Sequence, residues 1–241
     1  MSRFIPHFNY IKAYILQPKL LRKAMSKIIH IKNDPIAAVA LAAERIKNGK
    51  VIAVPTDTIY GIAAMVQSFE AVQDLYTIKS RNPHKPIAIC VSRIEDIQKW
   101  AEVTVPNTLL NDLLPGPVTV VFHRTAALNP DFNSTTSLIG LRIPNHQFIC
   151  QLADRVGSPL ALTSANISSE QSSLSVNEFE VLWPKLDLVF DGGVIGETKA
   201  SRLGSTVVNL SNQGYYKIIR NGSAYEDTVN TLQKYGLKEE R

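Results

Sequence analysis

The spacing of apolar positions along the chain predicts that helices and strands alternate. Apolar residues recur every three or four positions, as on the buried face of a helix, near 35–48, 68–79, 106–114, 145–156 and 176–183 and again after Ser223. Short apolar runs with the length of buried strands lie at 51–54, 87–91, 118–122, 138–143, 160–163 and 186–190. Two further runs, "STVVNL" and "YYKIIR", flank Asn212-Gln213-Gly214 and predict a hairpin.

Side chains that favour helix starts predict where several of these helices begin. Asp34 precedes Pro35, which places an N-cap acid before a proline at the first helical position. The Ser-x-x-Glu spacing of a capping box occurs at 92–95 and 223–226. Asn145 is expected to cap the helix that ends near Val156.

This pattern predicts a single α/β domain with a twisted mixed sheet and flanking helices. A length of 241 residues with 45% hydrophobic and 20% charged residues fits one globular domain with an extension. The sequence contains no internal repeat, and no apolar stretch approaches the length of a membrane span. Ligands of such sheets bind where strands end and loops diverge, so we expect a site there.

The basic residues are unevenly distributed along the chain. Residues 1–33 hold seven Lys and Arg residues and no acid, whereas residues 34–241 hold 19 basic and 21 acidic residues. We therefore separate a basic N-terminal segment, 1–33, from a catalytic domain, 34–241. The segment is similar to a mitochondrial presequence, with a basic tail as the alternative, so we expect a cytoplasmic or mitochondrial location. We expect the segment to be dispensable for the chemistry.

Several familiar chemistries lack their motifs. No phosphate-binding G-x-x-x-x-G-K-[ST] loop and no G-x-S-x-G run is present. The five histidines have no metal-ligand spacing, and the metal ligands remain unknown at this stage. Cys90 and Cys150 lie in apolar runs and are interpreted as core thiols of a reducing compartment.

Four segments end a predicted strand or helix in compact polar residues and together predict a shared polar pocket. They are "PTDT" at 55–58, "KSRNPHK" at 79–85, Arg142, and "SAN" at 164–166. Their basic residues favour an anion with several oxygen atoms, and Arg142 can grip a carboxylate or phosphate with two donors. A solvated helix end is the alternative for the basic cluster. Asp57 is expected to cap its turn rather than to bind a metal.

Six motifs, in this order, give the chain a resemblance to a known family. "PTDTIYGI", "KSR" followed by "KP", "PGPVTVV", "LRIP", "TSAN" and "STVVNL…IIRNG" resemble those of the YrdC-type threonylcarbamoyl-AMP synthases, from about residue 36 to residue 225. The resemblance implies a YrdC-like domain with a concave polar and basic pocket. It also implies an ATP-dependent nucleotidyltransferase that joins L-threonine, bicarbonate and ATP, with Mg²⁺, into threonylcarbamoyl-adenylate and pyrophosphate.

The resemblance also implies roles for individual residues. Thr58, Arg142 and Ser205 would bind threonine. The ATP site would consist of Arg81, Lys85, Ser164, Asn166, Ser172 and Arg220. Lys79 and Arg81 would act in catalysis, and because they lie at a helix end we expect their truncation to leave the fold intact.

An RNA-binding module that uses a basic concave surface is the alternative function. The body carries a net charge of −2 and lacks the interleaved aromatic residues of such modules, which argues against stable tRNA binding. We therefore expect a separate tRNA threonylcarbamoyltransferase to use the product.

Overall fold

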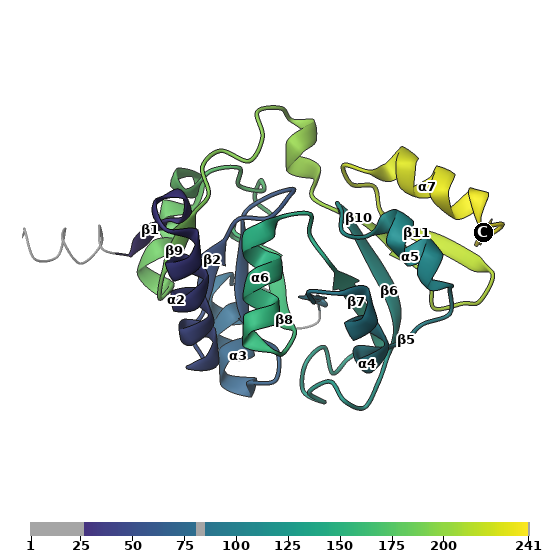
Figure 1. The fold of residues 1–241 in the computed structure, drawn as a ribbon, viewed down its shortest axis with the longest axis horizontal. Helices are drawn as coiled ribbons and strands as arrows, with labels where there is room; N and C mark the ends of the chain where they lie inside the picture. The colour runs from purple at the N-terminus through teal and green to yellow at the C-terminus, as the bar shows by residue number, and fades with distance from the viewer. Residues whose placement is uncertain (1–26, 81–84, 241) are drawn as a thin grey trace, which may run out of the picture.

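A single mixed sheet extends through the molecule from one end of the described chain to the other (Figure 1). The structure is a computed structural model that describes residues 27–80 and 85–240. Within these residues the sheet has twelve strands, with eleven in the order β1-β9-β2-β3-β8-β4-β7-β6-β10-β11-β12 and β5 beside β6. They are β1 (Ile28–His30), β2 (Ile52–Val54), β3 (Gly61–Met65), β4 (Ala88–Cys90), β5 (Ala101–Glu102), β6 (Val118–Arg124), β7 (Leu138–Arg142), β8 (Leu160–Ser164), β9 (Val189–Asp191), β10 (Thr206–Asn209), β11 (Tyr215–Arg220) and β12 (Lys238–Glu239).

Parallel and antiparallel neighbours alternate irregularly across this sheet, which confirms the predicted mixed α/β fold. Strand β2 runs parallel to β9 and antiparallel to β3, and β4 runs parallel to β7 and antiparallel to β8. Strands β10 and β11 form the predicted hairpin, with Gly214 in its turn at φ +80°. The residues of β3 pair with both β2 and β8, but the sequence analysis did not predict this strand.

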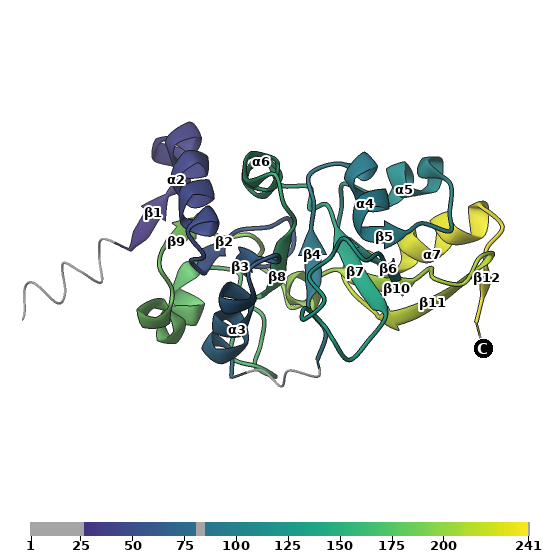
Figure 2. The ribbon, with the colours of Figure 1, turned by 90° about the horizontal axis from the view of Figure 1, so that it is seen from below.

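Helices cover both faces of the sheet (Figure 2). They are α2 (Pro35–Lys47), α3 (Phe69–Ile78), α4 (Ile97–Trp100), α5 (Asn107–Leu113), α6 (Gln147–Val156) and α7 (Tyr225–Lys234), with 3₁₀ segments η1 (Ile31–Asn33), η2 (Ile94–Asp96), η3 (Val176–Lys185) and η4 (Ala200–Leu203). Helices α2 and α6 lie side by side on one face, and α3 lies on the other. None of the helices in the described ranges combines the length and the apolar composition needed to cross a membrane.

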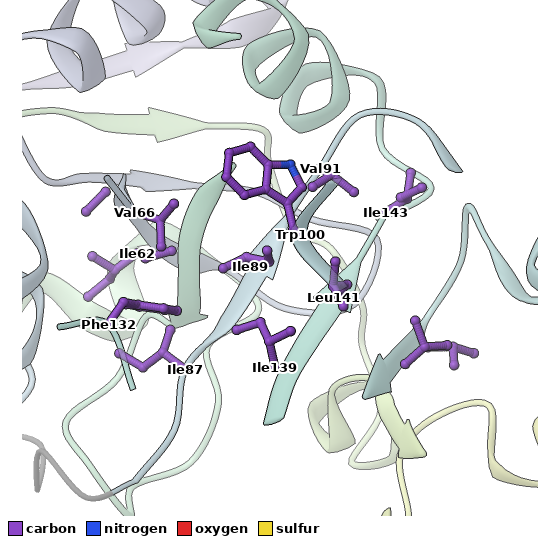
Figure 3. Packing of buried hydrophobic residues seen from close by; sticks show 14 of the residues in the cluster. Ile62, Val66, Ile87, Ile89, Val91, Trp100, Phe132, Ile139, Leu141 and Ile143 are labelled. Carbon is purple, nitrogen blue, oxygen red and sulfur yellow. The ribbon is translucent and has the colours of Figure 1, made fainter. Parts of the chain in front are cut away.

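The strands bury apolar side chains on both faces, which explains their short continuous apolar runs. Ile52 and Val54 belong to the cluster under α2 and α6, whereas Val51 and Ala53 point into the larger cluster on the opposite side. Figure 3 shows part of the larger cluster, where side chains from β3, β4 and β7 meet Trp100 and Phe132. Burying each large side chain of this kind contributes about 1.5–3 kcal/mol, so this packing holds the sheet in place.

Local capping rules predict only some of the helix starts. Asp34 accepts a hydrogen bond from the Ala37 amide at 2.9 Å and caps α2 as expected. The other three cap predictions are wrong, because Arg93, His146 and Ala224 occupy the N-cap positions and none of them makes a side-chain cap hydrogen bond. The Asn145 amide donates to Asp57, Ser92 donates to Asp96, and the hydroxyl of Ser223 donates to the carbonyl of Gly204.

The sheet includes residues from the basic N-terminal segment. Strand β1 runs parallel to β9, and the Lys27 Nζ donates to the Leu186 carbonyl at 2.8 Å and to the Trp183 and Pro184 carbonyls at 3.4 Å. The folded body therefore includes residues before Asp34, and η1 joins β1 to α2. Residues 1–26 and the targeting hypothesis attached to them lie outside the described residues.

We predict that the length of an N-terminal truncation decides its effect on stability. A protein that begins at Met25 should unfold at the same temperature as the full chain. A protein that begins at Lys32 lacks β1 and the contacts of Lys27, and we expect it to be less stable by about 2–4 kcal/mol, from several hydrogen bonds worth ~1 kcal/mol each and the apolar surface of Ile28 and Ile29. Urea unfolding followed by circular dichroism measures the difference, and equal stability of the two truncated proteins would show that β1 contributes nothing.

Candidate functional site

A cleft of about 820 Å³ lies against the middle strands of the sheet. Its apolar surface comes from Ile59, Ile87, Ala88, Ile89, Val121, Leu138, Leu162, Val207 and Ile219. Its hydroxyl and basic groups come from Thr56, Tyr60, Lys85, Thr119, Thr136, Arg142, Thr163, Ser164, Ser205 and Arg220. The predicted polar pocket therefore exists, with polar groups arranged around an apolar surface, as in many small-molecule sites.

The structure brings five of the predicted site residues directly to the cleft: Lys85, Arg142, Ser164, Ser205 and Arg220. Three more, Thr58, Lys79 and Asn166, are buried next to residues that line it. Ser172 is half-buried and does not line the cleft, and its carbonyl accepts a hydrogen bond from Arg202 at 2.7 Å. Arg81 lies outside the described residues.

The turn after β2 is held together by the hydroxyl of Thr56. Its Oγ1 accepts from the amides of Thr58 at 3.1 Å and Ile59 at 3.3 Å and donates to the Ile59 carbonyl at 2.7 Å. The Oγ1 atoms of Thr56 and Thr58 are 3.2 Å apart. Both residues are buried, so small hydroxyl side chains satisfy a turn that has no access to water.

Arg142, the last residue of β7, forms a buried ion pair with Asp57. Its Nη2 donates to Asp57 Oδ1 and, at 2.8 Å, to the Thr58 hydroxyl. The second carboxylate oxygen of Asp57 accepts from the Asn145 amide at 2.9 Å, just before α6. The side chains of Arg142 and Asp57 are 9% and 8% exposed. Asp57 therefore fixes Arg142, and the predicted turn cap is wrong, because Thr56 rather than Asp57 makes the hydrogen bonds within the turn.

Arg142 retains donors for a ligand. A guanidinium group carries five N–H donors, and Nη2 supplies both described hydrogen bonds. Its Nε has no hydrogen-bond partner among the described residues. Nε is buried, so the Nη1 donors are the ones that suit a carboxylate entering the cleft that Arg142 lines.

Lys79 has a different position from the one expected at a solvated helix end. The residue follows α3 and is only 1% exposed. Its Nζ donates to the carbonyl and, at 3.1 Å, to the hydroxyl of Ser164, and at 3.2 Å to Asn166 Oδ1. A buried ammonium group of this kind holds the "SAN" segment in place. Because Lys79 is buried rather than solvated, we no longer expect its truncation to leave the fold intact.

Asn166 links the same segment to the loop that follows. Its side-chain amide donates to the carbonyls of Ile167 at 3.0 Å and Glu170 at 2.6 Å, while its oxygen accepts from Lys79. Every polar atom of this amide is used inside the protein. Lys79 and Asn166 thus position Ser164, which is the member of the group that lines the cleft.

Ser205 and Arg220 come together across the β10–β11 hairpin. Arg220 donates to the Ser205 carbonyl from Nε at 3.1 Å and from Nη2 at 2.8 Å, and Nη2 also lies 3.1 Å from the Ser205 hydroxyl. The same hydroxyl lies 2.7 Å from the hydroxyl of Thr119 on β6. These contacts place a cation and two hydroxyl groups on one side of the cleft.

Tyr60 connects the cleft to the turn after β9. Its hydroxyl donates to the Gly193 carbonyl at 2.7 Å and accepts from the Gly192 amide at 2.9 Å. Burial raises the pKa of this phenol, so it stays protonated at neutral pH. Tyr60 therefore does not act as a base, and its hydrogen bonds hold the turn at Gly192 and Gly193 in place.

The two cysteines and His146 are not suited to covalent chemistry in the cleft. Burial raises the pKa of the Cys90 and Cys150 thiols, which keeps both protonated, and it lowers the pKa of His146. None of these three residues lines the cleft. The described parts of the chain also contain no cluster of three His, Cys, Asp or Glu side chains that could hold a metal ion.

The sequence does not predict the roles of Asp57 and Thr119 in this site. Asp57 is expected only as a turn cap, because its partner Arg142 is 85 residues away and no local pattern indicates the ion pair. Thr119 was not noticed, because a threonine inside an apolar strand looks like a packing residue.

Comparisons with known proteins agree with this architecture. The model of the Sua5/YciO/YrdC family, described as telomere recombination, matches residues 44–222. Threonylcarbamoyl-AMP synthase of Mus musculus is 51% identical over 203 residues, which cover 83% of this chain and 72% of the mouse protein. The protein of that name from Homo sapiens is 50% identical over 203 residues and covers 83% and 73% of the two chains.

A solved structure, P. abyssi Sua5 complexed with L-threonine, aligns with a TM-score of 0.71 and 25% identity. The alignment covers 84% of this chain and 58% of the P. abyssi chain. The structure of E. coli YciO, at 21% identity and a TM-score of 0.68, supports the fold alone. By its ordered motifs, its sheet and the family match over residues 44–222, this chain belongs to the Sua5/YciO/YrdC family.

Proposed function

We propose that this protein is a threonylcarbamoyl-AMP synthase that converts L-threonine, bicarbonate and ATP into threonylcarbamoyl-adenylate and pyrophosphate. The observation that carries the proposal is the single cleft where Arg142 and Ser205 meet Lys85, Ser164 and Arg220. The identity of about 50% to proteins named threonylcarbamoyl-AMP synthase supports it. The product would supply threonylcarbamoyladenosine in tRNA.

Threonine would bind at the end of the cleft that holds Arg142. The free donors of the guanidinium bind its carboxylate, while Asp57 prevents the cation from turning away. The hydroxyls of Thr58 and Ser205 are neutral partners for the amino acid. The related P. abyssi protein was solved with L-threonine, which supports this class of substrate.

ATP would occupy the remaining length of the cleft. Lys85, Arg220 and Ser164 bind its phosphates or ribose, and the aliphatic residues of the sheet provide an apolar surface for the base. Lys79, Asn166 and Ser172 would contribute by holding the loops around Ser164. We also assign Arg81 to the triphosphate, on the family resemblance of its motif.

The reaction needs positioning more than acid–base chemistry. The amine nitrogen of threonine adds to the carbon of bicarbonate, and loss of water leaves a carbamate. A carbamate oxygen attacks the α-phosphorus of ATP, the bond from that phosphorus to the β-bridging oxygen breaks, and pyrophosphate leaves with the electron pair. Fixed cations around the cleft stabilise the charge that develops on the phosphate oxygens.

Mg²⁺ would enter as part of the MgATP substrate. Asp57, a carboxylate next to the cleft, is occupied by Arg142 and by the Asn145 amide. The phosphate oxygens and water would therefore supply most of the ligands of the ion, as is common for Mg²⁺.

An RNA-binding module is not favoured, because aliphatic and hydroxyl side chains line the cleft and Tyr60 is the one aromatic residue among them. We propose instead that a separate tRNA threonylcarbamoyltransferase consumes the adenylate. A cytoplasmic or mitochondrial location remains a proposal based on the basic segment 1–33.

Pyrophosphate release tests the proposed reaction. Purified protein with MgATP should release pyrophosphate only when both threonine and bicarbonate are present, because the carbamate requires both. Nucleoside analysis of unmodified tRNA added to the same mixture should find no threonylcarbamoyladenosine. Release without threonine would contradict the proposed activity, and modified tRNA without a second protein would contradict the proposed division of labour.

Lys79 and Lys85 should respond differently to truncation, although they are close in sequence. Lys79→Ala leaves Ser164 and Asn166 without their buried donor, and we expect a loss of about 1–3 kcal/mol of stability together with activity. Lys85 is exposed at the cleft, so Lys85→Ala should raise the KM for ATP and lower the unfolding temperature less than Lys79→Ala does. Differential scanning fluorimetry and ATP titrations separate the two effects. Equal melting temperatures for both variants would contradict the structural role of Lys79.

Replacement of Asp57 should affect threonine more than ATP. Asp57→Asn removes the charge that holds Arg142, and we expect the KM for threonine to rise about tenfold, equivalent to ~1.4 kcal/mol, with a small change for ATP. The exposed pair of Lys234 and Asp112, away from the cleft, provides a matched control, since Asp112→Asn should change neither constant. A normal KM for threonine in Asp57→Asn would show that the ion pair plays no part in threonine binding.

A further inference from the structure

Thr119 lies between two residues assigned to threonine. Its strand, β6, is between β7 and β10 in the sheet. Val120 pairs with Leu141 in the antiparallel register, so the adjacent residues Thr119 and Arg142 lie opposite each other on β6 and β7. On the other side Thr119 pairs with Val207, two residues after Ser205. Thr119, Arg142, Ser205 and Val207 line the cleft, whereas Val120 and Leu141 do not.

The shape of the neighbouring strand directs the two branches of the Thr119 side chain. A Cβ atom built at Gly140 on β7 would lie 3.1 Å from Thr119 Cγ2, so the methyl group occupies the space that the glycine leaves. The hydroxyl branch points toward the residue that precedes β10, and its oxygen lies 2.7 Å from the Ser205 hydroxyl. Thr119 is 4% exposed, so protein atoms hold this rotamer rather than water.

The hydrogen bonds around Ser205 Oγ determine what that hydroxyl can offer a ligand. A serine hydroxyl has one donor hydrogen and two acceptor lone pairs. Nη2 of Arg220 fills one acceptor position at 3.1 Å, because a guanidinium group only donates. When Thr119 donates to the second position, the hydrogen of Ser205 must point elsewhere, and the cleft is the open direction.

We propose that Thr119 is a positioning residue that, together with Arg220, makes the Ser205 hydroxyl a dedicated hydrogen-bond donor to an oxygen atom of bound threonine. This inference rests on the proposed function. It adds a residue that itself makes no essential contact with the substrate and acts through Ser205. It also couples the two ends of the cleft, because the Arg220 that is assigned to ATP helps to orient the hydroxyl that is assigned to threonine.

Three substitutions at Thr119 test this role by threonine titration in the pyrophosphate assay. Thr119→Val keeps the branched shape and removes the hydroxyl donor. Thr119→Ala also removes the hydroxyl donor, with a smaller side chain. We expect each to raise the KM for threonine about three- to tenfold, the effect of one hydrogen bond. Thr119→Ser keeps the donor and should restore the wild-type KM. The KM for ATP should change less than twofold in all three.

Two controls separate positioning from a general structural role. Thr228 is also buried, and its hydroxyl donates to the Ala224 carbonyl in α7, away from the cleft, so Thr228→Val should leave the threonine KM unchanged. In a Ser205→Ala background Thr119→Val should have no further effect on that constant, because the group it orients is gone. Thermal unfolding of each variant establishes that it is folded at the assay temperature.

The outcomes separate this inference from the proposed function. If the wild-type protein releases no threonine-dependent pyrophosphate, the proposed function fails. If the wild type is active and both Thr119→Val and Thr119→Ala keep the wild-type KM for threonine, the positioning role fails while the function stands. An additive effect of Thr119→Val in the Ser205→Ala background would also overturn the inference, since Thr119 would then act independently of Ser205.

Discussion

The buried ion pair of Arg142 and Asp57 is the interaction on which the arrangement of the cleft depends. It joins the turn after β2, the end of β7 and, through the Asn145 amide, the start of α6. Breaking such a pair by removing one partner leaves an uncompensated charge and costs about 3–5 kcal/mol. The three segments are therefore held in one position relative to each other, and Arg142 presents its remaining donors to the cleft from a fixed place.

The other polar residues follow the same principle, in which buried groups hold the groups that reach the cleft. Lys79 and Asn166 hold the segment that carries Ser164, and Thr58, itself buried, accepts a hydrogen bond from Arg142. Cations near a proposed anion site thus divide into two kinds. The ammonium group of Lys79 is buried and donates its hydrogen bonds to protein acceptors, while Lys85, Arg142 and Arg220 line the cleft. An apolar surface beneath these cations lowers the local dielectric and strengthens their effect on a phosphate.

This division fits a reaction that needs alignment of a carbamate with a phosphate. Burial raises the pKa values of the Cys90 and Cys150 thiols and of the Tyr60 phenol, so these three groups stay protonated and are poor nucleophiles. Fixed donors can be aimed at the positions where negative charge develops and need no reorganisation during the reaction. In the proposed role of Thr119, its hydroxyl likewise fixes the direction in which the Ser205 hydroxyl donates its hydrogen.

The sequence by itself determined most of the elements, the mixed α/β class and the family, because periodic apolar positions and ordered motifs are local signals; the strands β1, β3, β5 and β12 were not predicted. Polar element ends brought Lys85, Arg142 and Ser164 to one predicted pocket, and the family resemblance added Ser205 and Arg220. Only the tertiary structure decided that Lys79 is buried, that Asp57 pairs with Arg142 and that Asn145 and Ser223 bond outside their helices. These outcomes depend on partners that are up to 88 residues away in the chain, and a local pattern holds no information about which distant acceptor or donor will meet a side chain.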